Sequence, residues 1–242
     1  MAPPTQREPL VLLPAMLTDA GLWRRQRDAL VSLGRVEALD LVGQRSIAAM
    51  AGRVLDLAPP SFALAGLSLG GMVAMEIALR APERVTRLAL LDTSARAPTD
   101  QQRAFWAGLA ESAREKGVRV TMREQLIDSL RTPDRHDDAA LTEEVLSLAE
   151  RVGVAGLEDQ LSMQAGRVQM RERLRAIRCP TLVVRGELDA LCSEEMHEEI
   201  CAAIPHARYV RVPECGHLAT LEQAPAITAL LDYWWAGDSA IA

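Results

Sequence analysis

The chain has 242 residues, of which 49% are hydrophobic and 25% charged, with a formal net charge of −6. This length suits one large α/β domain or two small ones, and the composition is ordinary for a globular protein. The negative charge and the lack of a basic tract disfavour nucleic-acid binding. No apolar run is long enough to span a bilayer, and residues 1–5 lack the basic and apolar stretches of a signal peptide. We therefore expect a cytoplasmic protein that binds neither nucleic acid nor membrane.

The four cysteines show no C-x-x-C spacing of the kind that zinc and redox sites use. They are Cys179, Cys192, Cys201 and Cys215. We expect four reduced thiols, because cytosolic proteins rarely form disulfides. The sequence therefore predicts neither a metal site nor a cofactor, and it leaves the oligomeric state open.

The first ninety residues alternate between short apolar strands and helical stretches. We expect strands at residues 9–13, 36–42, 62–67 and 87–91, and helices at 19–33, 47–57 and 69–80. Such alternation is typical of parallel strands joined by right-handed helical crossovers. Continuously apolar strands, such as Leu-Ala-Leu-Leu at 88–91, fit a sheet that is covered on both faces.

The alternation stops after Asp92, and no strand is expected between residues 98 and 178. This stretch predicts helices at 99–115, 120–130, 138–152 and 154–167. Strands then return at 181–185 and 209–212, with helices at 193–203 and 222–235. The sequence thus predicts a doubly wound, mostly parallel α/β core from residues 1–97 and 177–242. A helical cap, or lid, from residues 98–176 interrupts it, and such insertions often cover the edge of the sheet where ligands bind.

A candidate nucleophile lies between an expected strand and an expected helix. Residues 66–70 read Gly-Leu-Ser-Leu-Gly, which matches the G-x-S-x-G nucleophile elbow. The glycines relieve crowding at the tight turn, and the helix N-terminus favours negative charge near the Ser68 hydroxyl. The alternative reading is that Ser68 only caps the helix between packing glycines.

A serine nucleophile needs a base and an acid that orients the base. His217 follows the last expected strand, so it should lie at the same sheet edge as Ser68. The other three histidines are expected to have structural or surface roles. Asp189 follows the strand at 181–185, and we rank it first as the acid, ahead of Asp92 and then Glu187. The order serine, acid, histidine is the one expected on this kind of sheet.

Three motifs resemble those of the α/β-hydrolase fold superfamily. They are Gly-Leu-Ser-Leu-Gly-Gly at 66–71, Gly-Glu-Leu-Asp at 186–189 and Cys-Gly-His-Leu at 215–218. The resemblance implies a serine esterase-like member with a helical lid and a triad of Ser68, Asp189 and His217. It also implies an oxyanion hole made by the backbone N–H groups of Met16 and Leu69. The His-Gly pair that many members carry near this loop is absent here, but a backbone donor tolerates side-chain change.

The expected function is hydrolysis of carboxylic esters with small-to-medium apolar acyl groups, through an acyl-enzyme on Ser68. Apolar residues of the cap are the candidates for the substrate pocket: Phe105, Trp106, Leu109, Met122, Leu126, Leu130 and Met163. The same triad would also serve a C–C bond hydrolase, a lactonase, a thioesterase or a cofactor-free perhydrolase. A ligand-binding protein with an idle triad is the alternative from another class.

Overall fold

The computed structural model describes residues 7–237, so the segment on which the signal-peptide prediction rests lies outside it. Its six parallel strands form one sheet in the order β2-β1-β3-β4-β5-β6. The strands are β1 (Arg7–Leu13), β2 (Gly34–Ala38), β3 (Phe62–Leu67), β4 (Val85–Leu91), β5 (Thr181–Gly186) and β6 (Arg208–Val212). The predicted doubly wound parallel sheet is confirmed. No helix within residues 7–237 combines the length and the apolar character that crossing a membrane requires.

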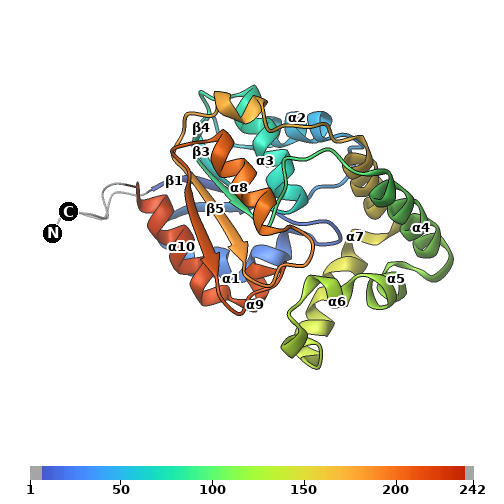
Figure 1. Cartoon of the computed structure of the whole chain (residues 1–242). Helices are drawn as coiled ribbons and strands as arrows, with labels where there is room; N and C mark the ends of the chain where they lie inside the picture. The colour runs from blue at the N-terminus through green and yellow to red at the C-terminus, as the bar shows by residue number, and fades with distance from the viewer. Residues whose placement is uncertain (1–6, 238–242) are drawn as a thin grey trace.

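Helices cover both faces of the sheet (Figure 1). One face packs against α1 (Arg24–Leu30) and α10 (Ala224–Ala236), and the other against α2 (Ile47–Leu57), α3 (Leu69–Arg80) and α8 (Glu194–Ala203). Successive residues of β1 enter these two cores alternately, because side chains of a strand point to opposite faces. Leu10 and Leu12 join the first core, and Val11 and Leu13 join the second.

Most elements lie within two residues of their predicted bounds, but several differ more. The helix expected at 19–33 is a 3-10 helix (Ala20–Trp23) followed by α1, with Asp19 accepting a capping bond from the Gly21 N–H. Strand β2 ends at Ala38 because it is an edge strand, and its last partner on β1 is Leu12. The closing helix predicted at 222–235 is α10, and a short helix that was not predicted, α9 (Ala219–Glu222), precedes it; Pro225 in the first turn of α10 has no N–H to join the two.

All regular elements between β4 and β5 are helices or 3-10 turns, as predicted. This segment contains α4 (Asp100–Lys116), α5 (Val118–Gln125), α6 (Ile127–Leu130), α7 (Ala139–Gly166) and the 3-10 turns Pro133–Arg135 and Arg173–Ala176. We call α4–α7 the helical insert. Element α7 consists of two helical segments separated at Gly153, whose φ of +69° and ψ of 178° are not helical, so the division predicted between residues 138–152 and 154–167 is confirmed. Figure 1 shows the insert gathered on one side of the sheet.

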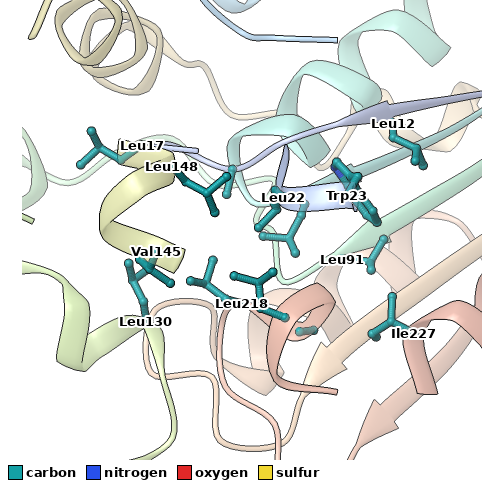
Figure 2. Packing of buried hydrophobic residues seen from close by; sticks show 14 of the residues in the cluster. Leu12, Leu17, Leu22, Trp23, Leu91, Leu130, Val145, Leu148, Leu218 and Ile227 are labelled. Atoms are coloured by element: carbon teal, nitrogen blue, oxygen red, sulfur yellow. The ribbon is translucent and has the colours of Figure 1, made fainter. Parts of the chain in front are cut away.

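The helical insert shares a hydrophobic core with the sheet domain. Leu130, Val145 and Leu148 of the insert belong to the same buried cluster as Leu22 and Leu218 (Figure 2). Val145 is fully buried and Leu148 is 1% exposed. Because such contacts remove apolar area from water, they hold the insert over the sheet.

Candidate active site

Ser68 occupies the sharp turn between β3 and α3. Its φ of 54° and ψ of −112° lie outside the regions that ordinary residues favour. This is the strained turn that the strand–serine–helix pattern predicts. The Ser68 N–H donates to the Leu91 carbonyl at 2.9 Å, and the Ser68 carbonyl accepts from Thr93 Oγ1 at 2.7 Å. Neighbouring strand β4 therefore holds the strained residue in position.

Gly70 allows α3 to approach the end of β1 closely, and substituting it is expected to destabilise the protein. A Cβ there would lie 2.7 Å from the Pro14 carbonyl oxygen and would also overlap the Leu13 carbonyl. We expect Gly70→Ala to cost about 3 kcal/mol and to lower Tm by about 6–12 °C in a calorimetric scan. Gly108→Ala is the matched control, since nothing lies within 4 Å of that Cβ and alanine favours a helix interior. An equal loss in both variants would contradict the argument.

His217 and Asp189 form a buried pair. His217 Nδ1 lies 3.0 Å from both carboxylate oxygens of Asp189, and the two side chains are 3% and 0% exposed. Within residues 7–237 the ring's hydrogen bonds all run from Nδ1 to Asp189, which leaves Nε2 available to the cavity. Burial alone would raise the pKa of Asp189. The interaction with His217 and the N–H bonds from Leu191 and Cys192 outweigh burial, so the pKa is lowered and the carboxylate is charged.

Asp92, the second-ranked acid, is fully buried beside Asp189 and is not paired with His217. Its Oδ1 accepts from the Gly186 N–H at 2.7 Å. Its Oδ2 has no donor among the described residues. Burial raises the pKa of Asp92 well above its usual range, and the charge of Asp189 raises it further. Both effects favour the neutral form of the Asp92 carboxyl, which can give its proton to a hydrogen bond with Asp189. The third candidate, Glu187, forms an ion pair with Arg211 instead.

The two candidate oxyanion donors lie on separate segments of the chain. Leu69 is the first residue of α3, and Met16 lines the same cavity as Ser68. Among the hydrogen bonds of residues 7–237, neither backbone N–H is used as a donor. The next residue, Leu17, has a φ of +56°, which marks a sharp turn in the Met16 loop. Both N–H groups are thus without an acceptor among the described residues, and they remain the candidates for an oxyanion hole.

Gln160 of α7 holds the Met16 loop, and the sequence analysis did not identify it. Its Oε1 accepts from the Leu17 N–H at 2.8 Å, and its Nε2 donates to the Leu41 carbonyl at 3.3 Å. Gln160 is fully buried, although it belongs to the helical insert. No motif marks such a residue. Its only signal in the sequence is a polar side chain on an otherwise apolar helix face.

We expect Gln160→Leu to lower kcat about 10- to 100-fold with little change in KM, because the Met16 N–H loses its orientation. The Leu17 N–H would also be left buried without an acceptor, which costs about 1–3 kcal/mol. Steady-state kinetics and a thermal melt measure both effects. The control is Ser162→Ala on the same helix, whose hydroxyl donates only to the Glu158 carbonyl. A kcat for Gln160→Leu equal to that of this control would contradict the role.

Ser68 and His217 open into one mostly apolar cavity of about 180 Å³. Its walls include five of the predicted pocket residues: Phe105, Trp106, Met122, Leu126 and Leu130. Met163 and Leu109 are not part of it, which corrects their assignment. Both are fully buried, and Met163 packs in the core cluster that contains Leu69 and Met72. Met163 therefore faces the sheet domain, and helical spacing alone could not separate that face from the cavity face.

The other three histidines do not line this cavity, and each has backbone partners. His136, His197 and His206 lie within 3.1 Å of the carbonyls of Asp128, Ser193 and Cys179, respectively. His197 is fully buried and also accepts from the Thr93 N–H at 3.3 Å. These contacts fit the structural roles predicted for them.

Asp189, Cys192 and His217 are close enough to one another to resemble a metal-binding group. All four cysteines are free thiols. Burial raises the pKa of the Cys192 thiol well above its usual range, so the ligand form is disfavoured. The carboxylate and the imidazole are already paired with each other. These three residues therefore suit an acid–base pair better than a metal site.

A parallel sheet with a strained serine after β3 and a buried histidine–carboxylate pair at the same cavity defines a hydrolase of the α/β type. The chain belongs to the alpha/beta hydrolase fold family, whose model matches residues 42–224. It is 29% identical over 238 residues to a pimeloyl-[acyl-carrier protein] methyl ester esterase from Yersinia enterocolitica, covering 92% of this chain and 91% of that protein. A relative from Azorhizobium caulinodans, named as a carbamate hydrolase, is 32% identical over 86% of this chain and 84% of its own.

Among solved structures, a thermophilic esterase from Thermogutta terrifontis superposes with a TM-score of 0.86 at 27% identity. The match covers 95% of this chain and 89% of that one. The resemblance drawn from the three motifs is therefore confirmed at the level of the family.

Proposed function

We propose that this hydrolase cleaves carboxylic esters with small-to-medium acyl groups through an acyl-enzyme on Ser68. The observation that carries the proposal is that Ser68 and the His217–Asp189 pair meet at one largely apolar cavity of about 180 Å³. A cavity of that size has room for a short acyl chain. The esterase names of the relatives support the same reaction.

In the proposed first step, His217 Nε2 takes the proton of the Ser68 hydroxyl as Oγ attacks the ester carbonyl. The Met16 and Leu69 N–H groups donate to the oxyanion that forms. The imidazolium is stabilised by the Asp189 carboxylate and then gives its proton to the departing alcohol. Water attacks the acyl-enzyme in the second step, again with His217 as base, and releases the acid and free Ser68.

A substrate panel tests this function. Purified enzyme is assayed with p-nitrophenyl esters of two to twelve carbons, matched thioesters and simple lactones, and is treated with a fluorophosphonate probe. We expect rapid labelling of Ser68 and the highest kcat/KM for esters of short-to-medium chain. A higher kcat/KM for thioesters or lactones than for esters would make the protein a thioesterase or a lactonase that uses the same acyl-enzyme mechanism. Absence of both labelling and turnover would instead favour a binding protein with an idle triad.

A further inference from the structure

Arg167, the residue directly after α7, lines the same cavity as Ser68 and His217. Neutral groups hold its guanidinium in place. Its Nε donates to the Arg96 carbonyl at 3.0 Å, and its Nη2 donates to Gln102 Oε1 at 3.4 Å. The Nη1 donates to Gln164 Oε1, and the guanidinium lies 5.2 Å from the centre of the Trp106 ring. The side chain is therefore fixed at the cavity wall.

The charge of Arg167 has no carboxylate partner in the part of the chain that the structure describes. Many other arginines of the protein form ion pairs; Arg96, for example, pairs with Glu199 at 2.9 Å. No described Asp or Glu forms an ion pair with Arg167. The nearby Cys192 thiol would be a counterion only as a thiolate, a form that its raised pKa disfavours, and the charge of Arg103 is of the same sign. Burial lowers the pKa of Arg167 to about 10, so the group is still a cation at neutral pH. Arg167 is half-buried, so its charge is partly removed from water without a counterion, and an anionic ligand would offset the cost.

The guanidinium also keeps donors for such a ligand. Arginine has five N–H donors, and oxygen acceptors occupy three of them. One remaining donor has only the weak acceptor Met72 Sδ at 3.9 Å. The flat fork of arginine matches a carboxylate well, and the amide nitrogen of Gln164 is a further donor at the same wall.

We propose that Arg167 binds a carboxylate of the substrate, so that the esters or lactones cleaved at Ser68 carry a second, free carboxylate group. This proposal rests on the proposed function. The proposal adds that Arg167 gives the apolar cavity one charged position. The carboxylate, on either the acyl or the alcohol part of the substrate, would bind at this position. Neutral esters would then be accepted as poorer substrates that leave the guanidinium without a counterion.

The test compares two substrates that share a leaving group and differ in charge: p-nitrophenyl butyrate and mono-p-nitrophenyl glutarate. We expect the wild type to prefer the glutarate half-ester. In Arg167→Met, the ratio of kcat/KM for the half-ester to that for the butyrate should fall about 10- to 100-fold, the range for a lost charge-assisted hydrogen bond. Arg167→Lys should recover part of it. Arg114→Met is the matched control, because Arg114 lies on α4, pairs with Glu158 and does not line the cavity.

Two further measurements do not depend on the folding of a variant. 4-(Butyryloxy)benzoate carries its carboxylate on the alcohol side, and a charge preference for either this substrate or the half-ester supports the proposal. Glutarate should inhibit butyrate hydrolysis by the wild type competitively, and neutral glutaramide should not. The proposal would be overturned if the wild type showed equal kcat/KM for charged and neutral substrates and equal inhibition by glutarate and glutaramide. It would also be overturned if the ratio of kcat/KM for the half-ester to that for the butyrate were unchanged in Arg167→Met. If Ser68 is not labelled by fluorophosphonate and no ester is cleaved, the proposed function itself has failed.

Discussion

Replacing Ser68 with alanine is expected to lower kcat for p-nitrophenyl butyrate by a factor on the order of 10⁴ to 10⁶. The variant loses the proposed nucleophile but keeps the N–H groups of Met16 and Leu69, which is why some rate above that of water should remain. KM should stay within about three-fold, since a hydroxyl that acts in the transition state adds little to ground-state binding.

The same variant should fold normally. Serine and alanine both carry a Cβ, so the strain of a residue at φ 54° is the same in each. A thermal melt of Ser68→Ala therefore serves as the folding control. Fluorophosphonate labelling should disappear in Ser68→Ala and persist in Ser94→Ala, the variant of the other serine that lines the cavity. Undiminished turnover or labelling in Ser68→Ala would place the nucleophile elsewhere.

The second large effect is a difference in kcat between variants of the two buried aspartates, Asp189 and Asp92. Asp189→Asn is expected to lower kcat about 10⁴-fold, because the amide can hold His217 in the wrong tautomer and cannot stabilise the imidazolium. Asp92→Asn should lower kcat by no more than about five-fold, since an amide is a close match to a neutral carboxylic acid. Its oxygen can still accept from the Gly186 N–H, and its nitrogen can donate to Asp189. Equal losses in the two variants would contradict the assignment of Asp189 as the acid.

The pH dependence of stability provides a second check on Asp92. In the unfolded chain an aspartate loses its proton near pH 4, whereas burial beside Asp189 keeps Asp92 protonated in the folded state to higher pH. The unfolded state then binds fewer protons than the folded state, so Asp92 destabilises the wild type progressively as pH rises above about 4. Asp92→Asn has no such titration. Its Tm should therefore increase relative to that of the wild type between pH 4 and 8.

Much of the site could be predicted from local patterns. The bounds of β3 and α3 agree with their prediction, because a continuous apolar run and a helical run meet at a single serine flanked by glycines. Because all strands of a parallel sheet end at the same edge, the loops after β3, β5 and β6 were expected there together, so Ser68, Asp189 and His217 could be nominated as one site. The type of each of these residues, and its place after a strand, can be recognised from a few neighbouring residues in the sequence.

The residues supplied by the helical insert could not be predicted in the same way. Helical spacing indicates which residues form an apolar face, but it does not indicate whether that face contacts the cavity or the core. Phe105 and Trp106 face the cavity, whereas Met163 faces the core. Gln160 and Arg167 carry no motif, and their partners Leu17 and Arg96 are 143 and 71 residues away in the chain.

The sequence by itself indicated the family, the parallel sheet and the candidate nucleophile and base, and it ranked three candidate acids, since each depends on periodicity and on motifs a few residues long. Only the tertiary structure decided that His217 pairs with Asp189, while burial favours the neutral form of Asp92. It alone showed that the insert orients the Met16 loop through Gln160 and presents Arg167 to the cavity. These outcomes depend on how distant segments pack, because burial and neighbouring charge decide whether a carboxyl or a guanidinium is neutral, paired or available to a ligand.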